Sequence, residues 1–211
     1  IASTATIRKA SDQIRNLFNR ATCMFPPPII DANNSGFAVE DPDLPGRRYV
    51  GVTTAGRSAK FTLQAASASL LQAADCSLIE TQQKDRFWTL VNYFNSLREL
   101  GGALVLMQDD VPKSITAIAE RRLETERSIR EPVELTSRVT QDEIRGILRT
   151  LSLSFGDPSA CDAVLASNMI SVGVDVPRLG VMVVNGQPKG VSEYIQATSR
   201  VGRDAKGPGG L

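Results

Sequence analysis

The sequence predicts an α/β fold, a mainly parallel sheet with helices on both faces, together with an irregular insertion. Strand-like and helix-like stretches alternate along the second half of the chain, as in α/β domains. The apolar runs at 163–166 and 179–184 lack polar alternation, which is typical of parallel strands that helices cover on both faces. Residues 21–48 are rich in Pro, Asn and Gly, which predicts an irregular segment.

The composition fits a globular domain and excludes several classes of protein. The chain has 211 residues, of which 42% are hydrophobic and 22% are charged. No apolar run approaches the roughly 18 residues of a membrane span, so no membrane partner is expected. The chain contains no histidine and its three cysteines lie far apart, which argues against a metal site and excludes a Ser-His-Asp triad. We expect a cytoplasmic protein.

Three parts are expected along the chain. Residues 1–20 form a linker and a first helix, because apolar side chains from Ile7 to Phe18 recur at helical spacing. Residues 21–85 form an insertion, with a strand at 48–54 and a helix at 60–74. Residues 86–211 form the core of the fold.

Within this core, helix caps and apolar stripes define the elements. Ser96 with Glu99, and Thr140 with Glu143, have the spacing of capping boxes and each predicts the start of a helix. The second of these helices carries one buried stripe, formed by Ile144, Ile147, Leu148 and Leu151. The remaining predicted elements are strands within 88–94 and 132–136 and a separate helix over 111–123, after the break at Pro112.

A polar loop follows the predicted strand 163–166. In parallel sheets, ligands bind at the carboxyl ends of strands, so the loop 167–177 is a candidate site. Gly173 allows close approach of the backbone to a ligand, and Asp175 offers a carboxylate to a sugar hydroxyl or to an arginine.

A second candidate site lies at 194–203. Ser192 is the predicted N-cap of a helix that ends at Gly202. Gln196 and Arg200 are four residues apart and would share one face of this helix, and Arg203 would point the same way. Two guanidinium groups and an amide suit phosphate oxygens, so an anionic ligand is predicted.

These residues resemble known helicase motifs. The run Gln-Ala-Thr-Ser-Arg-Val-Gly-Arg at 196–203 is similar to motif VI, and the loop 167–177 is similar to motif V. Residues 3–6 resemble motif III, 88–96 resemble motif IV, and 135–138 resemble the next strand-end segment. The chain thus resembles the second, C-terminal RecA-like domain of superfamily 2 DNA helicases and translocases. Within this superfamily it is most similar to the large prokaryotic helicases of the DISARM anti-phage defence type.

The resemblance implies a RecA-like fold of the P-loop NTPase type and a role for each matched position. Arg203 would be the arginine finger, Arg200 a second contact to the γ-phosphate of ATP, and Gln196 would orient their helix. The other implied site residues are Gly173 and Asp175 on the ATP side of the cleft, and Ser167, Thr136 and Ser137 against the nucleic-acid backbone. Ser199 departs from motif VI, where glycine is usual.

The resemblance also implies partners. ATP and Mg²⁺ would be bound mainly by an N-terminal RecA-like lobe of the same polypeptide, outside this chain. DNA is the expected nucleic acid, with RNA as an alternative, and other subunits of a defence complex are further expected partners.

The sequence contains neither a G-x-x-x-x-G-K-[S/T] loop nor a D-E-x-[D/H] run, so we expect the chain alone not to hydrolyse ATP. Two other functions stay open at this point. The first is a non-catalytic RecA-like scaffold for protein or nucleic-acid binding, although paired phosphate-facing arginines favour the enzyme. The second is a self-sufficient nucleotide-binding domain, which would bind ATP by itself.

Overall fold

The structure is a computed structural model, and it forms two units, Ile1–Pro45 and Gly46–Leu211. It describes residues 9–25, 27, 29–31, 33–44, 46–76, 79–171 and 174–203. The first unit contains helix α1 (Ala10–Phe18), followed by an irregular chain with isolated bridges from Asn34 to Asp31 and Val39. The motif III segment, Ser3–Thr6, lies outside the described residues.

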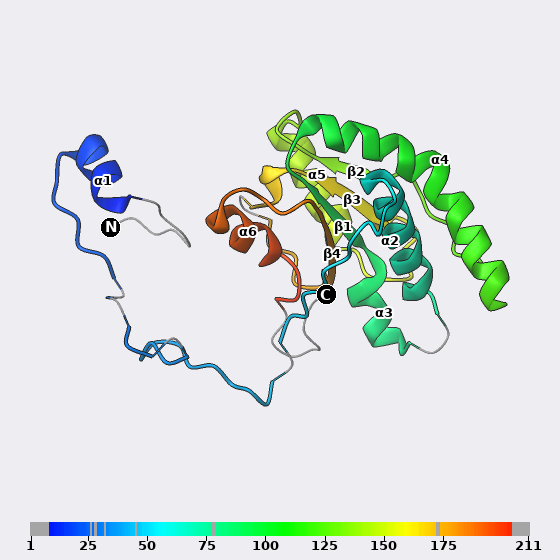
Figure 1. Cartoon of the computed structure of the whole chain (residues 1–211), viewed down its shortest axis with the longest axis horizontal. Coiled ribbons are helices and arrows are strands. Elements are labelled where there is room, and N and C mark those ends of the chain that lie inside the picture. Colours follow the sequence, from blue (N-terminus) through cyan, green and yellow to red (C-terminus); the bar gives the residue numbers. More distant parts are fainter. Residues whose placement is uncertain are drawn as a thin grey trace. The chain divides into compact units, whose positions relative to one another are not determined.

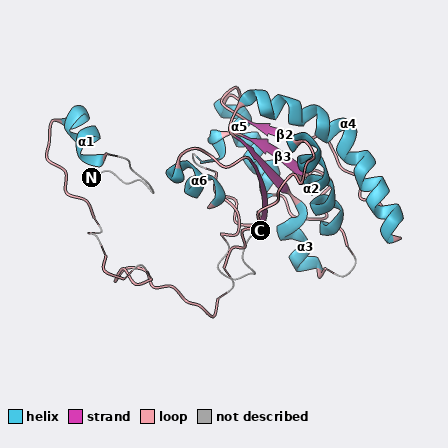
Figure 2. Ribbon diagram, viewed as in Figure 1, coloured by secondary structure: helices cyan, strands magenta, loops and turns pink. Residues whose placement is uncertain are grey.

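The second unit is built on a four-stranded parallel sheet with the order β2-β3-β1-β4 (Figure 2). The strands are β1 (Leu90–Phe94), β2 (Val133–Leu135), β3 (Ala163–Ala166) and β4 (Val181–Asn185). Every residue of β1 and β3 is buried, as expected for the central strands of a covered parallel sheet. The predicted α/β class is confirmed.

Helices cover both faces of the sheet (Figure 1). Helices α2 (Ala59–Ala74) and α4 (Leu97–Arg122) pack on one face, where Leu71, Leu106 and Ile115 join a core with Phe94 of β1. The opposite face is covered by α5 (Gln141–Ser152), the short helix η1 (Asn168–Ser171) and α6 (Val191–Thr198). Helix α3 (Thr81–Trp88) precedes β1.

Local sequence signals account for several helix starts. The Thr140 side chain accepts a hydrogen bond from the backbone of Glu143, and the Glu143 carboxylate accepts from the backbone of Thr140, which confirms this capping box. The Thr140 hydroxyl and the Thr140 backbone N–H both donate to the Glu143 carboxylate, and these two hydrogen bonds lower the pKa of Glu143. Ser96 caps α4 by accepting from the Glu99 backbone at 3.3 Å. Ser58 caps α2 in the same way.

The structure corrects four predicted elements. Helix α4 runs through Pro112 without a break, because Leu106, Val111 and Ile115 form one buried stripe across the proline. Residues 48–54 form no strand and are exposed. Trp88 ends a helix and does not belong to a strand, and the last strand begins at Val181, after Leu179.

Helix α2 confirms the predicted helix at 60–74 and is part of the core. Leu63, Ala68 and Leu71 are buried against α4 and the sheet. A polar contact adds to this packing, since the Ser67 hydroxyl lies 3.3 Å from Oδ1 of Asn92 in β1. The α2 helix therefore stabilises the sheet. Across the part of the chain that the structure describes, no helix is both long enough and apolar enough to cross a membrane.

Candidate functional site

The turn after α6 carries the two candidate arginines. Helix α6 begins after the N-cap Gly190 and ends at Thr198, so the predictions of an N-cap at Ser192 and an end at Gly202 are wrong. Gly202 has φ +63, a left-handed conformation that favours glycine, and its N–H donates to the Leu179 carbonyl at 2.7 Å. This hydrogen bond fixes the turn beside the segment that leads into β4.

Both arginines contact the polar loop that the sequence singled out. Arg200 Nη1 donates to the Val174 carbonyl at 3.1 Å. Arg203 Nη1 lies 2.7 Å from Oδ1 of Asp175, and their side chains are 38% and 66% exposed. The structure thus brings Arg200, Arg203 and Asp175 together. Gly173 lies outside the described residues.

The way in which these groups meet differs from the prediction. Gln196 lies in α6 and is half-buried, whereas Arg200, which the spacing predicts on the same helix, lies in the turn beyond its end. Both arginines contact the middle of the crossover from β3 to β4, at Val174 and Asp175, several residues beyond the end of β3. This follows because α6 continues the chain after β4 and ends beside Leu179, which precedes β4.

A tyrosine that sequence reasoning missed holds the start of α6. Tyr93 of β1 is fully buried and its hydroxyl donates to Oε1 of Glu193 at 2.6 Å. Burial raises the pKa of Tyr93 above its usual value, and the hydrogen bond and charge of Glu193 raise it further. No local sequence signal links these residues, because they belong to separate elements that only the fold brings together.

Two of the candidate nucleic-acid residues follow neighbouring strand ends. Leu135 of β2 pairs with Ala166 of β3, and Thr136 and Ser167 are the residues that directly follow this pair. Both are buried, and Thr136 Oγ1 accepts from the Arg138 backbone at 3.3 Å, whereas Ser137 is exposed. A groove of about 490 Å³ beside them is lined by Val133, Glu134, Thr136, Arg138, Val139, Glu143, Gly146, Ile147 and Thr150.

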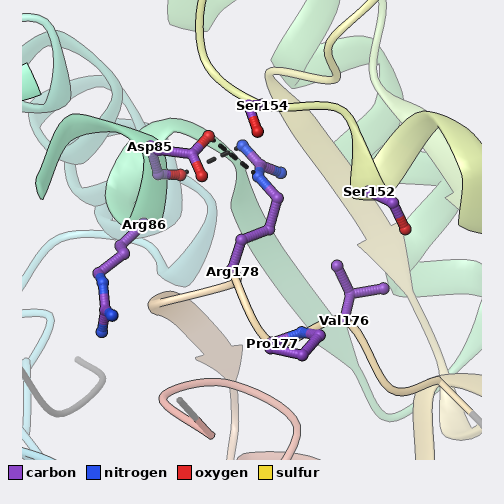
Figure 3. A pocket seen from close by; sticks show the side chains of 7 residues that line it. All are labelled: Asp85, Arg86, Ser152, Ser154, Val176, Pro177 and Arg178. Atoms are coloured by element: carbon purple, nitrogen blue, oxygen red, sulfur yellow. Dashed lines mark hydrogen bonds and ion pairs between the residues drawn. The ribbon is translucent and has the colours of Figure 1, made fainter. Parts of the chain in front are cut away.

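A second pocket, of about 430 Å³, contains a partly buried ion pair (Figure 3). Arg178 Nε lies 3.1 Å from Oδ1 of Asp85, and Nη1 of Arg178 donates to Thr89 Oγ1 and to the Leu151 carbonyl. Figure 3 shows that Arg86 points away from this pair. Because protein groups accept from the Arg178 guanidinium at several positions, we assign it a structural role that links α3, α5 and the segment before β4.

Comparisons with known proteins give a consistent result. Residues 76–205 match the family model described as the helicase conserved C-terminal domain. The DISARM protein DrmA of Bacillus paralicheniformis is 45% identical over 215 residues, which cover 98% of this chain and 19% of DrmA. The chain therefore spans about a fifth of the length of this curated relative.

Solved helicase structures are similar in fold. The helicase Lhr of Mycobacterium smegmatis, bound to ssDNA and AMP-PNP, matches with a TM-score of 0.54 and 16% identity, over 96% of this chain and 22% of Lhr. Dbp5 of S. cerevisiae, bound to RNA and ADP BeF3, matches with a TM-score of 0.51 and 12% identity, over 95% of this chain and 41% of Dbp5. At such identities the similarity concerns the fold, and it confirms the expected RecA-like architecture.

Proposed function

Because the chain belongs to the family of helicase conserved C-terminal domains, we propose that it is the second RecA-like lobe of an ATP-dependent DNA helicase or translocase. The 45% identity to a DISARM protein supports a role in a defence complex. The similar helicases that were solved with nucleotide and with ssDNA or RNA support ATP and a nucleic-acid strand as ligands.

The contact between the Arg200–Arg203 turn and Asp175 carries this proposal. Two guanidinium groups reach one loop, and the Arg203 side chain is 38% exposed, so it is accessible to a ligand outside this chain. A guanidinium fork suits the oxygens of a transferring phosphoryl group and stabilises charge that grows in the transition state. In this proposal Arg203 is the arginine finger of an ATP hydrolase and Arg200 is a second contact to the γ-phosphate.

The neighbouring residues complete the proposed nucleotide side. Asp175 would turn from Arg203 to the ribose when the lobes close, Gly173 would allow close approach of the backbone, and Gln196 would orient α6. The phosphates and Mg²⁺ would be held by the other lobe, because this chain carries no phosphate-binding loop sequence.

Movement along nucleic acid follows from closure and opening of the two lobes. ATP binding would join the lobes and hydrolysis would release them, which shifts a strand that is held on this lobe. Ser137 is exposed beside the strand ends and would contact the strand, together with Thr136 and Ser167 after local rearrangement. Contacts to phosphates depend little on the nucleotide sequence of the strand, and they weaken as the salt concentration rises.

Substitution of Arg203 in the full-length protein tests the proposal. For Arg203→Ala we expect kcat of the nucleic-acid-stimulated ATPase to fall by about 10³-fold, because the transition-state charge loses its partner. Arg203→Lys should recover little of the lost kcat, since an ammonium group lacks the planar fork of a guanidinium. Arg145→Ala is the control, because Arg145 is an exposed arginine of α5 paired with its exposed neighbour Asp142.

Wild-type turnover by the Arg203→Ala variant would refute the finger assignment. A different outcome would favour the scaffold function: a wild-type full-length protein that binds nucleic acid but does not hydrolyse ATP.

A further inference from the structure

The segment before α2 reaches the turn that carries the arginines. Residues 46–54 belong to no helix or strand, are exposed, and precede the family match at 76–205. Arg47 Nε nevertheless donates to the Val201 carbonyl at 2.7 Å, across 154 positions of sequence. The Tyr49 ring lies 6.2 Å from that of Tyr194 in α6. In Figure 1 this cyan segment passes beside the end of α6.

The acceptor of the Arg47 hydrogen bond lies between the two candidate arginines. A backbone carbonyl in a turn outside helices and strands depends on other donors for its hydrogen bond. Val201 lies just beyond α6, directly after Arg200 and two residues before Arg203. A charged guanidinium makes a strong hydrogen bond to such a carbonyl. Arg47 therefore restrains the backbone from which both arginines project.

The other contacts of this turn described above come from a different segment. Arg200, Gly202 and Arg203 contact Val174, Leu179 and Asp175, which all lie on the crossover before β4. Asp175 and Arg203 are an exposed pair, and such pairs hold a side chain weakly. Without Arg47, the backbone of the turn would lose a charged hydrogen bond and would sample more orientations.

We propose that Arg47, supported by Tyr49, is a positioning residue that holds the Arg200–Arg203 turn in the orientation needed for phosphoryl transfer. This inference rests on the proposed function. A finger acts only when its guanidinium is placed closely against the reacting group. Loss of Arg47 therefore lowers kcat, whereas KM for ATP changes little, because the other lobe supplies most of the ATP contacts.

The first test compares neighbouring arginines in the full-length protein. We expect Arg47→Ala to lower kcat of the nucleic-acid-stimulated ATPase about tenfold, the low end of what a hydrogen bond to a charged group contributes, with KM for ATP changed by less than about twofold. Arg47→Lys keeps a cationic donor and should recover part of the loss. Arg48→Ala is the matched control, since Arg48 is the adjacent exposed arginine. Equal kcat for Arg47→Ala and Arg48→Ala would overturn the inference.

The second test concerns the aromatic contact. Tyr49→Phe keeps the ring beside Tyr194 and should leave kcat unchanged, whereas Tyr49→Ala should lower it in the same direction as Arg47→Ala. Hydrogen exchange of the peptide 196–203 should quicken in Arg47→Ala and in Tyr49→Ala. Unchanged exchange in both variants would show that the segment does not restrain the turn.

The third test combines Arg47→Ala with Arg203→Ala. If Arg47 acts through the turn that carries the finger, its loss lowers kcat by a smaller factor once Arg203 is absent than it does in the wild-type background. Independent, multiplicative effects would overturn the inference. The two proposals can fail separately. Wild-type turnover by Arg203→Ala would refute the arginine-finger assignment. If Arg203→Ala loses turnover but Arg47→Ala keeps it, only the positioning role of Arg47 is refuted.

Discussion

At the scale of single residues, Asp162 is a buried carboxylate between two arginines. It accepts from Arg127 Nη2 at 2.9 Å and from the backbone and Nε of Arg130 at 3.0 and 2.9 Å. The Arg127 guanidinium also lies 3.6 Å from the Trp88 ring centre. Burial opposes ionisation of Asp162, but the hydrogen bonds from Arg130 and Arg127 outweigh it and hold its pKa below the usual value.

We predict that Asp162→Asn destabilises the protein by about 3–5 kcal/mol at pH 7, because Arg127 would stay buried without its counter-charge. The free energy of unfolding in urea measures this, and Asp142→Asn, at an exposed pair on α5, is the control. The pKa of Asp162 is lower in the folded state than in the unfolded state. Its stabilising contribution is therefore present above pH of about 4 and is lost as the pH falls through the folded pKa. A stability difference between wild type and variant that does not narrow in acid would contradict this account.

Cysteine reactivity offers a second test at this scale. Burial raises the pKa of Cys161 to about 11, so its thiol stays protonated at pH 8, and thiols react as thiolates. Cys23 is exposed. In native protein we expect iodoacetamide to label Cys23 well before Cys161, as followed by peptide mass spectrometry, and urea to remove the difference. Rapid labelling of Cys161 without denaturant would show that its surroundings open.

Residue-scale predictions from the sequence succeeded where a motif joined distant positions. The meeting of Arg203 with Asp175 follows from two helicase-like motifs. No local sequence pattern predicts the hydrogen bonds from Tyr93 to Glu193 and from Arg47 to Val201, because each joins segments far apart in the chain.

At the scale of elements, Gly180 lies at a close approach between α3 and the segment that leads into β4. Its N–H donates to the Arg86 carbonyl at 2.7 Å, and a Cβ atom at this position would lie 2.8 Å from the same oxygen. We predict that Gly180→Ala lowers the free energy of unfolding by about 1–3 kcal/mol, because the backbone must shift. Thermal and urea unfolding measure the change.

Gly146→Ala in α5 is the control for this prediction. Apart from its chain neighbours and the backbone of its own helix, no atom of the described residues lies within 4 Å of a Cβ added at Gly146, and alanine favours a helix over glycine by about 1 kcal/mol. This variant should therefore be slightly more stable than wild type. If Gly180→Ala were as stable as Gly146→Ala, the tight contact with Arg86 would not limit the fold.

Elements with strong local signals were predictable, and those decided by tertiary packing were not. The cap at Thr140 and the stripe of α5 specify a helix by themselves. The continuity of α4 depends on its packing against α2, which compensates for the hydrogen bond lost at Pro112. The sequence suggested a strand at 48–54, but this segment is exposed and takes no part in the described sheet.

At the scale of the whole molecule, we predict that the isolated chain has no ATPase activity and no micromolar affinity for ATP. The arginines can complete a phosphate site, but the chain has no phosphate-binding loop sequence to build one. Calorimetry with ATP and a phosphate-release assay test this, and each should be repeated with the full-length protein. Micromolar binding by the isolated chain would favour a self-sufficient nucleotide-binding domain.

The position of α2 has a practical consequence for anyone who expresses this protein in parts. The family match starts at residue 76, whereas Leu63, Ala68 and Leu71 of α2 fill the core on one face of the sheet. Gln72 and Leu71 also accept hydrogen bonds from Arg127. A polypeptide that begins at residue 76 would expose the apolar core surface that α2 covers, and Arg127 would lose two hydrogen-bond acceptors. We expect such a polypeptide to aggregate. A workable N-terminal boundary therefore falls ahead of Ser58, the cap of this helix.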